Sequence, residues 1–300
     1  MSTHSTTRRQ TRLGIAMGLG AYTAWGLLPL FIRALQALPV VDILAHRVIW
    51  SLAILLVLAT VLHRWSAIRA TIRTPRLMLA LAASTLLIAT NWGIYVHSVN
   101  SGHTLQASLG YFINPLVNVA LGVLFLRERL GRMEMAAILL AAGGVVALAV
   151  QQGGIPIIPL GLAFSFGLYG LVRKMVGLGP VEGLLIETSL LLPLAVGWLL
   201  TMPDAMAQPG SPPVWMLVAS GVVTTVPMLL FAGAANRMRY SELGLLQYIG
   251  PTLQLLIAVA VFGEPLLPIH LLAFALIWSG LAVYVFATWH RGRVTPVVPE

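Results

Sequence analysis

The sequence predicts an all-α membrane protein of ten transmembrane helices, built as two inverted five-helix repeats with both termini in the cytoplasm. Three observations support this prediction: an apolar composition, the distribution of basic residues, and a similarity between the two halves of the chain. A soluble domain carries about a quarter charged residues, whereas this 300-residue chain has 9% charged and 58% hydrophobic residues. We therefore expect most of the chain to lie within a lipid bilayer.

Ten apolar runs along the chain are long enough to span a bilayer. About twenty apolar residues cross a hydrocarbon core roughly 30 Å thick. The predicted spans cover residues 13–36, 43–63, 76–98, 104–126, 132–150, 155–175, 180–201, 214–236, 242–262 and 268–289. Residues 1–12 and 290–300 are predicted to be cytoplasmic tails. Little besides short loops remains, so the sequence leaves no room for a soluble catalytic domain.

The basic residues give an independent test of this topology. Cytoplasmic loops of membrane proteins collect Lys and Arg. An alternation that starts inside places all of the 18 Lys and Arg residues except Arg33 and Arg47 in cytoplasmic loops or tails. A missed or invented helix would have disrupted this alternation downstream. The net charge of +9 therefore indicates topology and not nucleic-acid binding, which would need one continuous basic face.

The two halves of the chain resemble each other. One constant shift superimposes identical residues of both halves: Asn100 on Asn236, Leu109 on Leu245, Pro115 on Pro251 and Glu128 on Glu264. Because each half holds an odd number of helices, the second half must enter the membrane upside down. Such inverted repeats are typical of secondary transporters, whose substrate site lies near the midplane at the repeat interface. We expect residues 13–150 and 155–289 to form the two repeats.

Polar residues on the fourth and ninth predicted spans indicate a central cavity. They recur on one helical face at spacings of three, four or seven residues, and they are Tyr111, Asn114, Asn118, Gln247 and Gln254. A proline within a span frees a backbone carbonyl, which lipid cannot satisfy. We therefore expect Pro115 and Pro251 to break these spans beside a cavity and to serve in gating. The alternative is that the amides only join helices and the prolines only kink them.

Other candidate substrate-binding residues lie on the first, third and sixth spans. Asn91 and Tyr95 share a face at i and i+4, and Trp25 lies in mid-span, echoed by Tyr169 in the second half. Aromatic side chains with a polar group suit an apolar pocket that fixes an amphipathic organic solute. Anchoring at the membrane interface is the alternative for Tyr95.

Two ionisable residues inside spans are candidates for proton coupling. A titratable group within the bilayer is a functional hypothesis by default, and histidine titrates near physiological pH. His46 in the second span and Glu187 in the seventh therefore form the candidate pair, although they are predicted near opposite membrane faces. The alternative is structural: Arg47 would snorkel to the outer interface and Glu187 to the inner one.

No catalytic constellation is present in the sequence. The zinc-helix motif, the nucleophile elbow and the phosphate-binding loop are all missing, and the chain has no cysteine. We therefore expect no catalytic residues, no metal site and no cofactor. Transport by this chain alone must then run on a gradient.

Four segments resemble a known family. Residues 42–51, 108–118, 166–170 and 243–254 are similar to the RarD-like branch of the EamA family, in the drug/metabolite transporter superfamily. The resemblance implies a ten-helix inverted-repeat permease of the bacterial inner membrane, often labelled a chloramphenicol-sensitivity protein, with relatives that export amino acids and other metabolites. It also implies a binding role for Tyr248, beside Gln247. Two positions depart from the family pattern, because Gln106 stands in place of Glu and His97 in place of Trp.

The sequence therefore predicts a secondary active transporter that exports small amphiphilic metabolites or drugs by alternating access. Its expected partners are a small-molecule substrate, the lipid bilayer and protons as the coupling ion, with no nucleic acid. A channel-like facilitator of small solutes is the alternative, and a membrane-embedded enzyme is a more distant one.

Overall fold

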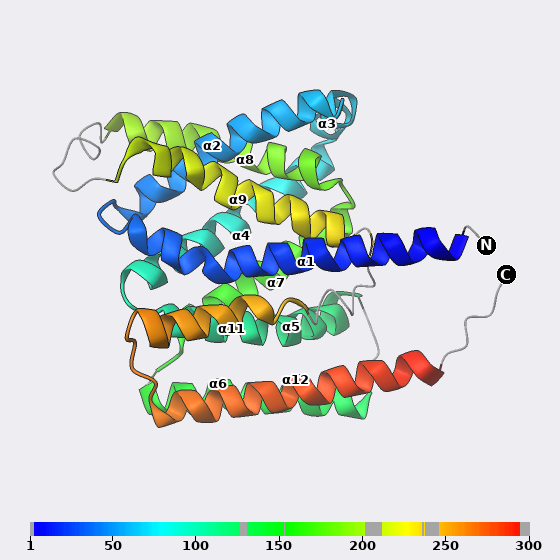
Figure 1. Ribbon diagram of the computed structural model, residues 1–300, viewed down its shortest axis with the longest axis vertical. Coiled ribbons are helices and arrows are strands. Elements are labelled where there is room, and N and C mark those ends of the chain that lie inside the picture. Colours follow the sequence, from blue (N-terminus) through cyan, green and yellow to red (C-terminus); the bar gives the residue numbers. More distant parts are fainter. Residues whose placement is uncertain are drawn as a thin grey trace.

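The computed structural model describes residues 3–126, 131–152, 154–201, 212–235, 237 and 246–294. These residues are helical apart from their connections (Figure 1), and no strand occurs among them. The helices are α1 (Thr3–Ala34), α2 (Val40–Val61), α3 (Trp65–Ile72), α4 (Pro75–Asn100), α5 (Thr104–Leu126), α6 (Arg132–Gln152), α7 (Ile157–Val176), α8 (Pro180–Thr201), α9 (Val214–Ala235), α11 (Ile249–Leu256), the π-helical turn η2 (Ile257–Val261) and α12 (Pro268–Val294). The all-α prediction is confirmed.

A helix lies in each of the ten predicted ranges, with three differences at the edges. The helix α3 lies in a loop where none was predicted. The helices α1 and α12 extend beyond the predicted apolar spans into residues predicted to be tails. Apolar length marks the part of a helix that crosses lipid, and the polar residues beyond it can continue the same helix. In the ninth range, residues 242–245 lie outside the described part of the chain, and α11 passes directly into η2.

Several of the described helices have the lengths and apolar surfaces of membrane spans. Five are long and apolar enough to cross a bilayer: Arg12–Ala34, Val40–Val61, Pro75–Asn100, Pro180–Thr201 and Val214–Phe231. Four shorter apolar helices accompany them: Met135–Gln151, Ile157–Arg173, Ile249–Val261 and Pro268–Val283. Large apolar side chains face outward, among them Leu79, Val150 and Leu200 at 75%, 76% and 76% exposure, which is unfavourable in water and favourable in lipid. The chain is a multi-pass membrane protein.

The helices pack mostly across the two halves of the chain. The helix α12 packs on α6, α7 packs on α4 and α5, α2 packs on α8 and α9, and α1 packs on α9 and α11. The helix α11 also packs on α5, and α4 on α8. Figure 1 shows α6 and α12 side by side at one edge of the bundle, away from α2 and α8.

Glycines allow several of these helices to approach closely. A Cβ atom built on Gly26 of α1 would lie 2.7 Å from Leu253 Cβ of α11, and one on Gly110 of α5 would lie 2.7 Å from the Pro159 carbonyl oxygen of α7. Membrane helices associate through such close backbone contacts. The core is therefore held by tight contacts between the halves.

Figure 1 also shows where the ends of the helices lie. The start of α1 and the end of α12 are at the same end of the bundle, together with α3. The turn between α4 and α5 and the connection between η2 and α12 are at the opposite end.

Candidate functional site

Three of the predicted binding residues meet between α4 and α5. The Asn91 side chain is buried, and its Nδ2 donates to the Leu162 carbonyl at 3.1 Å and to Ser165 Oγ at 3.0 Å. The Tyr111 hydroxyl donates to Asn91 Oδ1 at 3.1 Å. The rings of Tyr95 and Tyr111 are 5.8 Å apart. The structure thus joins Asn91, Tyr95 and Tyr111 in one polar and aromatic cluster against α7.

The amides of Asn114 and Asn118 form a second group on α5. Asn118 Nδ2 donates to Asn114 Oδ1 at 2.9 Å, and Asn114 Nδ2 donates to the Ala163 carbonyl of α7 at 3.4 Å. Gly167 of α7 leaves room for Asn118, whose Oδ1 lies 3.1 Å from where a Cβ would be. In this conformation the two amides join α5 to α7 across the two halves.

The candidates on α1 and α11 form a third group. Gln254 Nε2 donates to the Trp25 carbonyl at 3.1 Å, and Gln254 Oε1 is buried without a hydrogen-bond partner among the described residues. The Tyr248 ring stacks on Phe112 at 6.2 Å. Gln247 is half-buried, just before the start of α11.

The two prolines lie at different places in their helices. Pro115 is inside α5, which continues to Leu126, whereas Pro251 lies in the first turn of α11. The Pro251 carbonyl accepts a hydrogen bond from Ser108 Oγ of α5 at 2.7 Å. The departure from α-helical bonding follows further along, in η2, where the Phe262 amide donates to the Ile257 carbonyl at 2.9 Å.

Glu187 of α8 is buried among partners from two other helices, α4 and α7. Its Oε1 accepts from Ser84 Oγ at 2.6 Å and lies 3.7 Å from an Arg173 nitrogen, and its Oε2 accepts from the Tyr169 hydroxyl at 3.3 Å. The Glu187 side chain is 2% exposed, so it does not snorkel to the inner interface. His46 is half-buried on α2, and no hydrogen bond or ion pair joins it to Glu187 in the described part of the chain.

The structure contradicts the alternative that the Arg47 side chain snorkels to the outer interface. Its side chain is 4% exposed, and its Nε donates to Thr224 Oγ1 of α9 at 2.9 Å. The guanidinium carbon lies 4.9 Å from the centre of the Trp92 ring. Depth along one helix does not say which neighbouring helix a side chain faces. The contact of Arg47 with α9 was therefore not predictable from the sequence.

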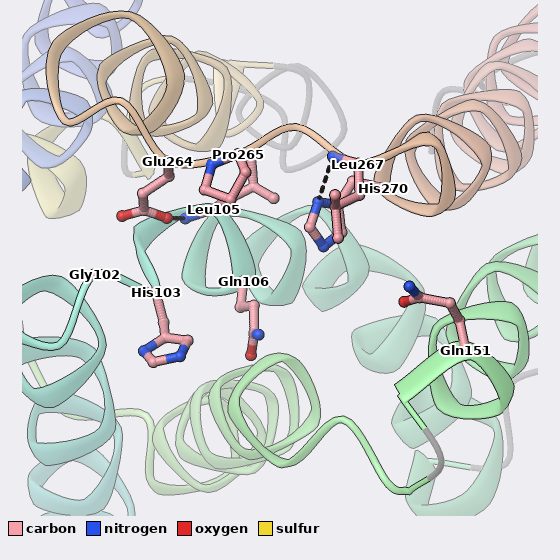
Figure 2. A pocket seen from close by; sticks show the side chains of 9 residues that line it. All are labelled: Gly102, His103, Leu105, Gln106, Gln151, Glu264, Pro265, Leu267 and His270. Carbon is pink, nitrogen blue, oxygen red and sulfur yellow. Dashed lines mark hydrogen bonds between the residues drawn. The ribbon is translucent and has the colours of Figure 1, made fainter.

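Two pockets open at the end of the bundle that holds the α4–α5 turn. The first has a volume of about 450 Å³ and is lined by Gly102, His103, Leu105, Gln106, Gln151, Glu264, Pro265, Leu267 and His270 (Figure 2). The second has about 560 Å³ and is lined by Gly93, Ile94, His97, Gln106, Ile155, Ile157 and Ile158. Gln106 lines both pockets and His97 the second, so both departures from the family pattern lie at these openings.

Glu264 is fixed at the first of these pockets. Its Oε1 accepts from the Thr104 amide and its Oε2 from the Leu105 amide, each at 2.8 Å (Figure 2 shows the Leu105 contact). A carboxylate at a helix N-terminus satisfies unpaired amides and complements the helix dipole. Glu264 lies between the ninth and tenth predicted spans, and the structure adds that it caps α5 from the other half of the chain. Its repeat mate Glu128 lies outside the described residues.

Replacing Glu264 with alanine should destabilise the protein by about 1–2 kcal/mol, because two helix-terminal amides lose their acceptor. Thermal unfolding of the purified protein in detergent measures this change. The replacement Gln106→Ala in the same pocket is the control, with an expected change within about 0.5 kcal/mol. Equal changes in the two variants would show that the cap does not stabilise α5.

Comparisons with known proteins agree with this architecture. The EamA-like transporter family matches residues 12–150. Protein RarD of Escherichia coli (strain K12) is 45% identical over 291 residues, which cover 96% of this chain and 98% of that protein. An uncharacterized transporter of Pseudomonas aeruginosa is 45% identical over 292 residues, covering 95% and 97% of the two chains.

A solved crystal structure shares the fold, with a TM-score of 0.58 and 20% identity over 91% of this chain and 96% of that one. The sequence similarity to the bacterial relatives is much stronger and extends over almost the whole chain. The chain belongs to the EamA-like transporter family, as a RarD-like member.

Proposed function

We propose that the chain is a secondary active transporter of the bacterial inner membrane that exports small amphiphilic metabolites or drugs by alternating access. Membership of the family makes it a membrane transporter and suggests that it is not an enzyme. The observation that carries the mechanism is the symmetry of its helix contacts.

The contacts exchange with one another when each helix is replaced by its counterpart in the other half. We pair α1 with α7, α2 with α8, α4 with α9, α5 with α11 and α6 with α12. The contact of α5 with α7 then becomes that of α11 with α1, and the contact of α4 with α7 becomes that of α9 with α1. The contact of α2 with α9 becomes that of α8 with α4. This exchange supports two inverted repeats, residues 13–150 and 155–289, with ten crossings in all.

The positions of the helix ends support the proposed orientation. The start of α1 and the end of α12 are at one end of the bundle (Figure 1), as an even number of crossings requires. The helix α3 is at that end, with Arg64, Arg69 and Arg73 in or beside it. Positive residues favour the cytoplasmic side, so this end is the cytoplasmic one.

The substrate site that we propose lies where the halves meet, as in other inverted-repeat transporters. Its residues are Trp25, Asn91, Tyr95, Tyr111, Asn114, Asn118, Tyr169, Gln247, Tyr248 and Gln254. Rocking of one half against the other would break the bonds that Asn114 and Gln254 make across the halves. Pro115, Pro251 and the neighbouring π-helical turn are the gating elements, since π-helical turns recur at functional sites.

Protons are the coupling ion in this proposal, and Glu187 and His46 are the groups that carry them. A proton bound by Glu187 would neutralise the carboxylate that now pairs with Arg173. Loss of this ion pair would weaken the link between α8 and α7 and so couple proton binding to helix movement.

Solute counterflow in proteoliposomes tests the transport proposal. Vesicles preloaded with unlabelled solute are given a labelled trace, with a panel of aromatic and aliphatic amino acids, other amphiphilic metabolites and chloramphenicol. Transient accumulation of one class supports a carrier and identifies its substrates. Flat traces, with a control transporter active in the same vesicles, would contradict the proposal and favour a channel-like facilitator.

The replacements Asn114→Leu and Asn118→Leu should each lower the counterflow rate at least about tenfold, because a buried polar partner for substrate or helix movement is lost. Ser189→Ala is the matched control, since Ser189 is exposed and donates only to the Leu185 carbonyl of its own helix among the described residues. Unchanged counterflow in both asparagine variants would remove this face of α5 from the substrate path.

A further inference from the structure

Arg47 has a buried charge that its neighbours satisfy only in part. It lies about 10 Å into α2 from Val40, at 1.5 Å per residue. A guanidinium has five N–H donors, and the described contacts use Nε–H, which donates to Thr224. The Nη1 atom is buried with no hydrogen-bond partner among the described residues. A charge left unpaired within a membrane protein is costly, and such a residue marks a functional site.

No carboxylate in the described part of the chain is available to pair with Arg47. Its buried carboxylates all have other partners: Asp42 accepts from the Trp198 indole, Glu182 pairs with Arg64, Glu187 pairs with Arg173, and Glu264 caps α5. An anionic partner for Arg47 must therefore come from outside these residues.

Further polar atoms close to Arg47 also lack partners. Ser51 Oγ lies one turn along α2 from Arg47, on the same face at i+4, and it is buried and unpaired among the described residues. The Tyr95 hydroxyl is also buried and unpaired among the described residues, and Tyr95 follows Trp92, whose ring covers the guanidinium, by three residues on the same face of α4. Together these groups offer a cation and two hydroxyl groups to one anionic ligand.

Aromatic rings continue from this polar group toward α7. The Trp92 ring covers one face of the guanidinium at 4.9 Å. Tyr95 lies 5.8 Å from Tyr111, and Tyr111 lies 6.2 Å from Phe166, between ring centres. An apolar body attached to the anion would find a surface of rings along this line.

We propose that Arg47 binds the carboxylate of a small organic acid whose apolar body lies along Tyr95, Tyr111 and Phe166. This inference rests on the proposed transport function and names the substrate class of that site. Arginine binds carboxylates through two parallel N–H···O bonds, and Thr224 and Trp92 hold the guanidinium in a fixed orientation for this contact. A carboxamide of the same shape carries no charge and offers the guanidinium one acceptor oxygen in place of two, so the site should select against it.

Ligand-induced thermal stabilisation of the purified protein in detergent tests the site. The probes are three acids and their amides: phenylacetate and phenylacetamide, indole-3-acetate and indole-3-acetamide, and N-acetylphenylalanine and N-acetylphenylalaninamide. At least one acid should raise the melting temperature of the wild-type protein in a saturable way, and its amide should not. Arg47→Gln should weaken binding of that acid about 10- to 100-fold, the loss of one charge-assisted contact, and Arg47→Lys should restore part of it.

Arg33→Gln is the matched control for charge. Arg33 donates to the Val99 carbonyl and lies over the Phe262 ring, outside the proposed site, so its replacement should leave acid binding unchanged. If none of the three acids binds, or if acids and amides bind equally, the inference is wrong. The comparison of acid with amide uses the wild-type protein, so it decides the question even if an Arg47 variant fails to fold.

Counterflow in proteoliposomes separates this inference from the transport proposal. An acid that binds through Arg47 but shows no counterflow would support the site and contradict the carrier. Counterflow of neutral solutes, with no acid binding, would support the carrier and contradict the site.

Discussion

Glu187→Gln should lower the melting temperature of the purified protein by about 10 °C. Removing one partner of a buried ion pair costs about 3–5 kcal/mol, and each kcal/mol shifts the melting temperature of a chain of this size by about 2–4 °C. The carboxylate and the Arg173 side chain are 2% and 17% exposed, so water replaces little of the lost interaction. Thermal unfolding in detergent, followed by circular dichroism, measures the shift.

Two further variants identify the cause of this loss. Glu182→Gln removes a carboxylate from the same helix whose partner Arg64 is 54% exposed, so a change of at most about 1 kcal/mol is expected. The double variant Glu187→Gln with Arg173→Gln removes the uncompensated charge and should recover part of the stability. A melting temperature for Glu187→Gln that equals that of Glu182→Gln would contradict a stabilising role for the buried pair.

The same variant also tests proton coupling. If Glu187 carries the proton, Glu187→Gln abolishes the dependence of transport on a pH gradient while leaving counterflow active. If transport by this variant still depends on the pH gradient in the same way, Glu187 has a structural role and does not carry the proton.

Gly110→Ala should destabilise the protein by about 1–3 kcal/mol, because overpacking of a tight contact forces backbones apart. A Cβ at Gly110 would lie 2.7 Å from the Pro159 carbonyl oxygen and 3.0 Å from Leu162 Cβ. Backbone atoms cannot move aside as a flexible side chain can, so α5 and α7 must separate. Thermal unfolding in detergent measures the loss.

Gly170→Ala is the control, and it should change stability in the opposite direction. No heavy atom lies within 4 Å of a Cβ built there, and alanine favours a helix over glycine by up to about 1 kcal/mol. If both alanine variants raise the melting temperature, helix propensity and not the α5–α7 contact controls the result.

The helices were predictable because each apolar run had to be long enough to cross lipid. The amphipathic helix α3 was missed because its eight residues lie in a basic loop below that length. Helical periodicity placed Asn114 and Asn118 on one face, and they do contact each other. Periodicity did not reveal that Asn114 bonds to α7, because that partner is far away in the sequence.

The partners of charged residues were not predictable for the same reason. Arg47 and Glu187 each contact helices from other parts of the chain, and the sequence gives only their depth along one helix. The alternative that both residues snorkel assumed that water at the nearest interface was the best partner. The structure instead surrounds Glu187 with polar groups from neighbouring helices, which makes its burial possible, and gives Arg47 one hydrogen bond to Thr224 of α9.

The pairing of α6 with α12, and of Glu264 with the start of α5, affects how the chain is made. Both partners belong to the second half, so the ribosome synthesises them long after α5 and α6 have entered the membrane. Until then the Thr104 and Leu105 amides lack their acceptor, and α6 lacks the surface on which it packs. The contacts of the first half can therefore be completed only after the final helices have been synthesised.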